Sequence, residues 1–229
     1  MNFEEIASRI LYEDNHLLAF HKPSGVLVQI DNKTDFSLET LIKSFLKERD
    51  QKPGNVYLGV VHRIDRPVSG LVIFAKTSKA LTRMNELFKL RSMEKTYMAL
   101  VKNKPQQLSG TIQSFLYKDP KTNKSKSFDK EFNGSKTAKT SYTYLASSDS
   151  WHLLEVKPYT GRHHQIRVHL AKLGCPIGGD LKYGSARSNS DGSIYLHAES
   201  LQFEHPVTKE ILILHCPLPQ TGAWKYFNL

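Results

Sequence analysis

Cysteines are few in this sequence, and long hydrophobic runs are missing from it. The two cysteines, Cys175 and Cys216, lie far apart and form no CxxC pair, so they indicate neither a disulfide framework nor a thiolate zinc site. No apolar stretch approaches the roughly 20 residues that a membrane span requires. The N-terminus, MNFEEIASRI, is acidic where a secretory signal would be basic. We therefore expect a protein of the reducing cytoplasm that has no membrane partner.

Acidic side chains are outnumbered by basic ones. Lysine and arginine total 32 against 22 aspartates and glutamates, which gives a net charge of +10 and a pI near 9.5. Such an excess favours a polyanionic partner, with nucleic acid as the leading candidate, although many soluble proteins are basic without one. The 229 residues can bury a complete core without disulfides or metals. We expect one catalytic domain over residues 1–229, acting as a monomer.

Helix and strand patterns alternate irregularly, without an internal repeat or a regular βα unit. This predicts an α+β fold whose mixed, largely antiparallel sheet is flanked by helices. Apolar spacing predicts a helix after Ser37, another after Ser78, and a third over Arg162–Leu173 that is closed by Gly174. Predicted strands lie at Leu17–Phe20, Val26–Val28, Leu71–Phe74, Lys95–Val101 and on both sides of a turn at His205–Lys209.

Five separated motifs follow one another along the chain: LYEDNHLLAFHKPSGVLVQ, HRIDRPVSG, KTYMALV, TGRHHQIRVHLAKLGCPIGGDLKYG and LHAESLQFEHP. In this order they resemble the RluA-type pseudouridine synthases, which isomerise uridines in ribosomal or transfer RNA. The second motif usually reads HRLDxxTSG, so Ile64 here replaces leucine and Val68 replaces threonine. The first change keeps bulk, and the second removes a hydroxyl beside the loop. The resemblance implies a single synthase domain with a central catalytic cleft, RNA as partner, and neither a cofactor nor a metal.

Asp65 stands between Arg63 and Arg66 in the second motif. Converting uridine into its C-glycoside requires breaking the bond from ribose to the base nitrogen, rotating the base and rejoining it through carbon. Uracil leaves as a delocalised anion, so one carboxylate can suffice where O-glycoside hydrolysis divides the work between two. Asp65 would then be an ionised nucleophile, or a base toward a ribose proton.

The resemblance also assigns two catalytic companions to Asp65. An ionised carboxylate in a closed pocket needs a cation, and Arg167 takes this place by the family pattern. Tyr97 matches the active-site tyrosine, whose ring can stack on an extruded uracil and whose hydroxyl can assist removal of the base proton. Outside these motifs, an Asp–Arg pair would more often be structural, and a tyrosine at a strand start would more often be simple packing.

A uridine inside folded RNA must be flipped out to reach Asp65, at a cost of a few kcal/mol. Contacts with the rest of the RNA have to offset this cost. We expect five basic side chains to contact the RNA backbone or fill the vacated position: Lys22, His62, Arg63, Arg162 and His163.

Residues 118–139 are rich in lysine and poor in large apolar side chains. We expect this segment to be a flexible insert or a long hairpin whose lysines hold phosphates loosely. Because the family pattern begins by about Ile10, we expect no N-terminal RNA-binding module. Substrate choice would then rest on the catalytic domain, aided by this segment, and deleting it would weaken RNA binding and flatten its salt dependence.

Two other function classes compete with the synthase. The ten histidines could serve a metallonuclease, but His163 and His169 are six positions apart, whereas ligands on one helix prefer i, i+3 or i+4, and no HxxxH or HExxH occurs. A catalytically silent RNA-binding module would be better served by a neutral or basic residue at position 65 than by a carboxylate. Chelator sensitivity would identify the nuclease, and absence of product from the wild-type protein would identify the module.

Overall fold

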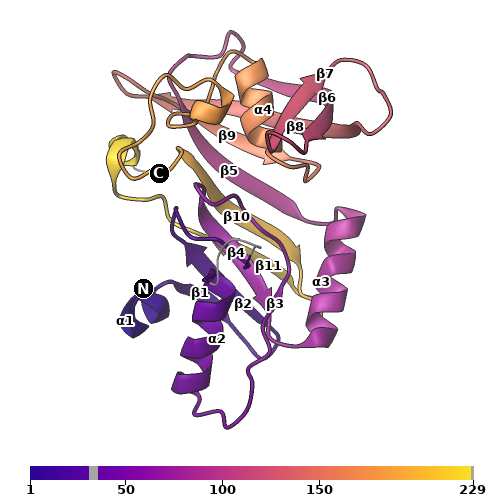
Figure 1. The fold of residues 1–229 in the computed structure, drawn as a ribbon, viewed down its shortest axis with the longest axis vertical. Coiled ribbons are helices and arrows are strands. Elements are labelled where there is room, and N and C mark those ends of the chain that lie inside the picture. Colours follow the sequence, from indigo (N-terminus) through magenta and orange to yellow (C-terminus); the bar gives the residue numbers. More distant parts are fainter. Residues whose placement is uncertain (31–35, 228–229) are drawn as a thin grey trace. The chain divides into compact units, whose positions relative to one another are not determined.

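The computed structural model describes residues 1–30 and 36–227, which form two compact units. Unit 1 comprises Met1–Met93 and Ala198–Pro217, and unit 2 comprises Glu94–His197 and Leu218–Leu229. Figure 1 shows the path of the chain, which leaves unit 1 at strand β5 (Glu94–Val101) and returns to it along β10 (Leu196–Glu204). Helices and antiparallel strands occur in both units, so the expected α+β class is confirmed.

Unit 1 is built on strands in the order β1-β2-β4-β10. The neighbours β1, β2 and β4 are antiparallel, and so are β3 beside β4 and β11 beside β10. Three helices accompany them. The bounds are α1 Phe3–Ser8, β1 Ile10–Glu13, β2 Leu17–Lys22, α2 Leu38–Arg49, β3 Gly59–Val60, β4 Ser69–Ala75, α3 Ser78–Leu90 and β11 Ile211–His215. The predicted strand Leu71–Phe74 and the pair around the His205 turn are therefore confirmed.

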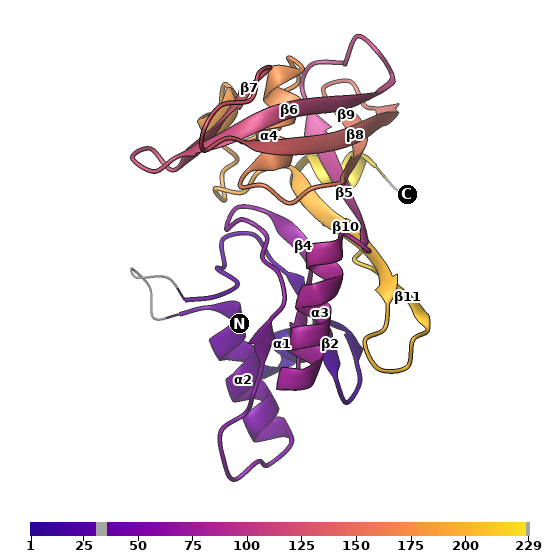
Figure 2. The ribbon, with the colours of Figure 1, turned by 90° about the vertical axis from the view of Figure 1, so that its right-hand side faces the viewer.

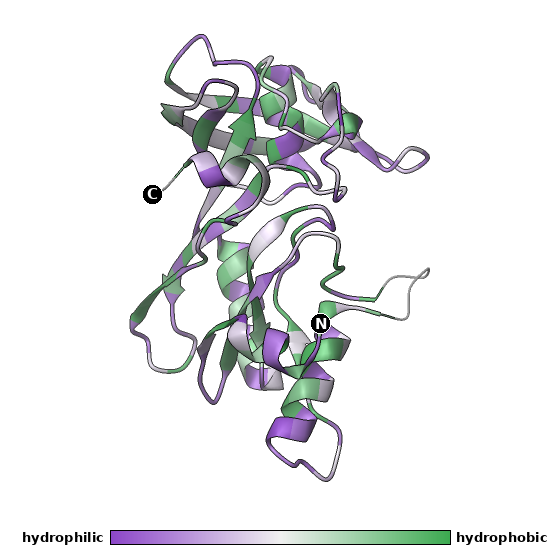
Figure 3. Ribbon diagram, turned by 90° about the vertical axis from the view of Figure 1, so that its left-hand side faces the viewer, coloured by the Kyte–Doolittle hydropathy of each residue, from purple (hydrophilic) through white to green (hydrophobic). Residues whose placement is uncertain are grey.

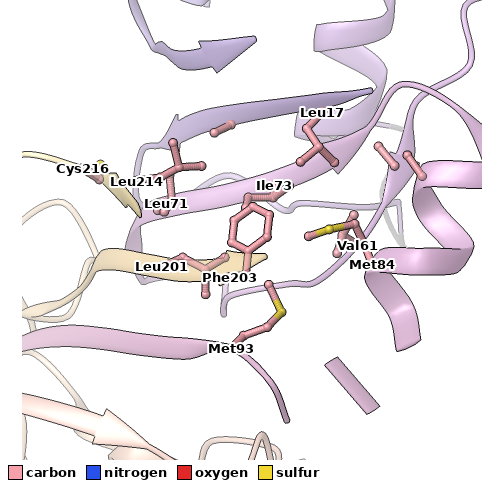
Figure 4. Close-up of a cluster of buried hydrophobic side chains, with 13 residues drawn as sticks. Leu17, Val61, Leu71, Ile73, Met84, Met93, Leu201, Phe203, Leu214 and Cys216 are labelled. Carbon is pink, nitrogen blue, oxygen red and sulfur yellow. The ribbon is translucent and has the colours of Figure 1, made fainter. Parts of the chain in front are cut away.

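One face of this sheet packs against α3. Alternate side chains of β2 and β4, such as Leu17, Leu71 and Ile73, meet Met84 of α3 and Phe203 of β10 in a buried cluster, shown in Figure 4. The alternate partners along the same strands, including Phe20 and Phe74, are buried as well. The central strands are thus covered on both faces.

The helix predicted after Ser37 is confirmed as α2, and the one predicted after Ser78 as α3. Ser37 forms a capping box with Thr40, and Thr77 caps α3. The strand predicted at Val26–Val28 is wrong. The carbonyls of Leu27 and Val28 accept the N–H groups of Leu38 and Glu39 at 2.7 and 3.1 Å, so this segment closes the start of α2.

Unit 2 is an antiparallel sheet in the order β5-β9-β8-β6-β7. Figure 2 shows that α4 covers one face of it. The bounds are β6 Ser109–Asp119, β7 Lys124–Phe128, β8 Lys136–Ser147, β9 His152–Pro158, α4 Gln165–Lys172 and the short 3-10 helices η1 Leu181–Tyr183 and η2 Gly222–Tyr226. The predicted third helix begins later than expected, because Arg162 to His164 form a turn before it.

The lysine-rich residues 118–139 contain the end of β6, all of β7 and the start of β8. Their cross-strand pairs, such as Lys118 with Ser125 and Tyr117 with Lys126, form a long hairpin. Ser125 and Ala138 are buried, which anchors this hairpin in the sheet. Of the two expected forms, the structure shows the hairpin.

Buried and more exposed positions alternate along β6 and β8 of unit 2, whereas every residue of β4 in unit 1 is buried. Figure 3 colours the residues by hydropathy. None of the helices in the described part of the chain is long and apolar enough to cross a membrane.

Candidate active site

Asp65 lies on the loop between β3 and β4 in unit 1. The N–H of Val68 donates to the carbonyl of Asp65 at 3.0 Å, closing a tight turn. Ile64 and Val68 on either side are buried at 8% and 2% exposure, whereas Asp65 is half-buried and Arg63 is exposed. The apolar neighbours therefore anchor the turn. The threonine hydroxyl of the usual motif would stand at a buried apolar position here, where valine packs without needing a partner.

Lys22 is the last residue of β2, contacts this turn and has 0% exposure. Its ammonium donates to the carbonyls of Pro23, Val26 and Arg66 at 2.9, 2.8 and 3.1 Å. Burial lowers the pKa of Lys22 to about 7, while the nearby Asp65 carboxylate raises it. The expectation that Lys22 contacts phosphate is wrong, because its ammonium is enclosed by protein carbonyls. It ties the Lys22–Gly25 turn to the residue after Asp65.

Arg66 also links the Lys22–Gly25 turn to the Asp65 loop, a role that the sequence did not indicate. Its Nε donates to the carbonyl of Gly25 at 2.8 Å, and its own carbonyl accepts the N–H of Gly25 at the same distance. Gly25 has φ +85°, a conformation that a side chain would strain. The sequence around Gly25 indicates a turn, but it does not reveal that Arg66 is the distant partner of that turn.

His62 is held by the scaffold of unit 1. Its Nε2 accepts the N–H of Ile73 at 3.1 Å, and its ring stacks on Phe88 with centroids 5.1 Å apart. Nε2 is therefore unprotonated, and the ring links the loop that carries Asp65 to β4 and α3. The exposed Arg63 follows directly. An RNA contact by either residue stays a prediction.

Arg167 lies in unit 2 on α4, with 5% exposure. Its Nε and Nη2 donate to the two carboxylate oxygens of Asp180 at 2.7 and 2.8 Å, and its Cζ lies 5.0 Å from the centre of the Tyr183 ring. The sequence reasoning missed both partners, although they belong to the same motif as Arg167. This geometry fixes the plane and the position of the guanidinium.

The two histidines before α4 connect it to β7. Ser125 donates its hydroxyl to the carbonyl of His163 at 2.7 Å, so His163 Nδ1, 2.9 Å away, carries the proton and donates back. The ring of His163 stacks on His164, whose Nδ1 lies 2.7 Å from the Tyr183 hydroxyl. Burial, and then the Arg167 charge, lower the pKa of His164 to about 2. His164 is thus a neutral acceptor for Tyr183.

Arg162 and Tyr97 complete the predicted residues of unit 2. Arg162 donates from Nε to the carbonyl of Thr137 at 3.1 Å, which fixes its stem against β8. Tyr97 is half-buried near the start of β5, opposite Val156 of β9. The structure thus describes Asp65 within unit 1 and both Tyr97 and Arg167 within unit 2. Their cooperation at one nucleotide stays a prediction.

The histidines considered as metal ligands have other partners. His169 is fully buried, with Nδ1 2.8 Å from the hydroxyl of Thr140 and Nε2 3.0 Å from that of Ser114. Burial lowers its pKa to about 4. Over residues 1–30 and 36–227, no three histidine, cysteine or carboxylate side chains lie close enough together to hold a metal ion.

Comparisons with known proteins agree with the motifs. The family described as RNA pseudouridylate synthase matches residues 16–172. The ribosomal large subunit pseudouridine synthase C of Yersinia pestis is 34% identical over 222 residues, which cover 93% of this chain and 66% of that protein. The tRNA pseudouridine synthase C of Vibrio cholerae is 32% identical, with 92% of this chain and 91% of that protein covered.

A solved structure extends the agreement to the fold. Human RNA Pseudouridylate Synthase Domain Containing 4 superimposes with a TM-score of 0.79 at 26% identity, covering 95% of this chain and 91% of that one. The chain spans about two thirds of the first of these relatives and nearly all of the second. The sequence, its motifs and the fold together place this chain in the RNA pseudouridylate synthase family.

Proposed function

We propose that this protein isomerises uridine to pseudouridine in ribosomal or transfer RNA, with Asp65 as the reacting residue. The observation that carries the proposal is the Asp65 turn, in a chain that belongs to the synthase family. The N–H of Val68 closes the turn, the buried Ile64 anchors it, and the ammonium of Lys22 donates to the carbonyl of Arg66 within it. Such mounting suits a carboxylate that must hold one position against a substrate.

The reaction is an isomerisation in which atoms balance without a cofactor. The bond between ribose C1′ and uracil N1 breaks, the base turns, and a bond forms between C1′ and C5. The proton on C5 leaves, and N1 gains one. Asp65 acts either as a nucleophile or as a base toward a ribose proton. Tyr97 stacks on the base and assists removal of the C5 proton, and Arg167 stabilises the ionised carboxylate.

Cationic side chains near the motifs serve RNA binding. Arg63 is exposed beside Asp65, while Arg162 and His163 precede α4. We assign phosphate contacts to these residues, which offset the cost of flipping the uridine. The names of two relatives specify ribosomal and transfer RNA respectively, so both substrates are candidates. We expect the protein to act in the cytoplasm as a monomer.

Pseudouridine mapping across total RNA tests the proposal. Cells that lack the gene should lose one or a few sites, and the wild-type gene should restore them. The Asp65→Asn variant should restore none while binding the RNA with near-normal affinity. Asp149→Asn, a matched change of an exposed aspartate, should restore all. Modification restored by Asp65→Asn would overturn the assignment of Asp65, and no site restored by the wild type would leave the RNA-binding module as the function.

A further inference from the structure

On the face of the unit 2 sheet opposite to α4, η2 packs against Met98, Leu100 and Leu153 of β5 and β9, but no helix of the described residues covers β6 and β8. Figure 2 shows β6 and β8 in front of α4, with the nearer face of these strands uncovered by any helix of the described chain. On the opposite, inner face, Ser114 of β6 and Thr140 of β8 are buried and bond to His169 of α4. Side chains alternate along a strand, so the residues next to these point to the uncovered outer face.

The strand register identifies the outer face residue by residue. Phe115 lies opposite both Phe128 of β7 and Thr137 of β8, and Tyr117 lies opposite Lys126. The next outer position of β6, Gln113, lies opposite Lys139. The outer face therefore combines aromatic rings with lysines. We call the set Phe115, Tyr117, Lys126, Phe128, Lys139 and Tyr159 the outer patch.

Tyr159 belongs to this patch through contacts with β8. Its hydroxyl accepts from Ser141 at 3.3 Å, and the Nζ of Lys139 lies 5.1 Å from its ring centre. Its side chain is nevertheless 52% exposed. Phe128 is 36% exposed and packs edge-on against the Phe132 ring, with centroids 4.8 Å apart. Large rings with this much surface in water favour a partner that stacks on them.

The charge of the outer patch selects the kind of partner. Lys126 and Lys139 are exposed, and neither forms an ion pair with any carboxylate in the described part of the chain. Two copies of this chain joined face to face would bring these lysines against each other, because a two-fold interface pairs a patch with itself. A flexible polyanion with exposed bases meets both features at once, since bases stack on rings and phosphates attract ammonium groups.

We propose that the outer patch binds a single-stranded segment of the substrate RNA, away from the uridine that reacts. The proposal rests on the proposed function only for the identity of the RNA. The patch lies on the face of the sheet opposite to α4, which carries Arg167, and opposite to Val156, which pairs with Tyr97. The segment bound here is therefore distinct from the flipped nucleotide, and it adds affinity and substrate choice rather than chemistry.

Oligoadenylate of about 12 nucleotides, within the range of single-strand sites, is the probe, because it offers no uridine to the catalytic residues. Its affinity is measured by fluorescence anisotropy at several salt concentrations. Tyr159→Ala should weaken binding about tenfold by loss of one stacked base. Lys126→Gln/Lys139→Gln should reduce the slope of log K against log[salt] by about 1.4, or about 0.7 for each phosphate contact on a single strand.

A matched control removes two exposed lysines elsewhere. Lys47→Gln/Lys79→Gln carries the same loss of charge on α2 and α3 and should leave the affinity and the salt slope nearly unchanged. Equal effects in both double variants would overturn the proposal in favour of a general charge effect. Oligoadenylate binding that none of the variants weakens would also overturn it, as would a dimer in solution that only the outer-patch variants dissociate.

Pseudouridine formation separates this proposal from the proposed function. With saturating RNA, the outer-patch variants should modify the target uridine at the wild-type rate, and at limiting RNA they should fall behind. If the wild-type protein were inactive but still bound oligoadenylate through the outer patch, the proposed function would be refuted and the RNA-binding role of the patch would stand. If the wild-type protein were active and the outer-patch variants bound and modified RNA normally, only the RNA-binding role of the outer patch would be refuted.

Discussion

Arg167 and Asp180 form a buried two-pronged ion pair, with Nε–Oδ2 and Nη2–Oδ1 distances of 2.7 and 2.8 Å. Their side chains are 6% and 1% exposed. Arg167 has five N–H donors in a rigid fork, and Asp180 takes one edge of it while Tyr183 lies against its face. Asp180 thus positions the Arg167 guanidinium, which we propose stabilises the Asp65 carboxylate.

Asp180→Ala should destabilise the protein by about 3–5 kcal/mol, because it leaves the buried Arg167 charge without its partner. Urea unfolding measures this. Asp180→Asn keeps the shape and one acceptor oxygen, so it should fold and show a reduced kcat with a nearly unchanged KM. Glu86→Gln, which removes an exposed pair with Lys89, should change stability by less than about 1 kcal/mol. A kcat of Asp180→Asn equal to the wild type would remove Asp180 from the positioning role.

Elements with strong local signals were predictable from the sequence. Ser37 with the apolar spacing behind it indicated the position of α2, and the turn at His205–Lys209 indicated the β10–β11 pair. Helix α1 was missed, although Asn2 and Glu5 have the spacing of a capping box and form one. Its six residues are too short for a periodic apolar pattern.

Features that depend on distant partners were not predictable in this way. The Val26–Val28 segment has the composition of a strand, but its carbonyls bond to the start of α2. The sequence indicated a surface cation at Lys22, whereas its buried ammonium donates to three carbonyls, of which that of Arg66 is 44 positions away. Asp180 is 13 positions beyond Arg167, and no helical or strand period predicts that pairing.

Lys22→Met should change how stability depends on pH. The pKa of Lys22 is about 7 in the folded protein, against 10.5 for a lysine side chain in water. Between these values the unfolded chain binds more protons, so wild-type stability should gain up to about 1.4 kcal/mol per pH unit from this residue as pH rises from 7. The variant lacks the titrating group and should lack that gain. Unfolding free energies at pH 7, 8 and 9 measure the difference, and parallel curves for the two proteins would contradict it.

Gly70→Ala should destabilise unit 1 and displace the loop before it. Gly70 has φ +120°, and an added Cβ would lie 2.3 Å from the carbonyl oxygen of Ala198. Backbone atoms cannot yield as a side chain can, so we expect a loss of more than about 3 kcal/mol together with reduced activity. Gly54→Ala is the matched control, because its Cβ meets nothing within 4 Å and its φ is not positive. Equal melting temperatures for the two variants would refute the claim that β4 requires a glycine at position 70.

His169→Gln should flatten the loss of stability in mild acid. The buried His169 has a pKa lowered to about 4 by burial, against 6.5 for a histidine side chain in water. Its neutral form stabilises the fold fully above pH 6.5, and this contribution falls as pH drops toward 4, because the unfolded chain takes up the proton first. From pH 6.5 to 5 the wild type should lose about 1.6 kcal/mol through this residue. The variant, although less stable at pH 7 through weaker bonds to Ser114 and Thr140, should lose less over that range. An unchanged pH slope in His169→Gln would show that His169 is not the residue responsible.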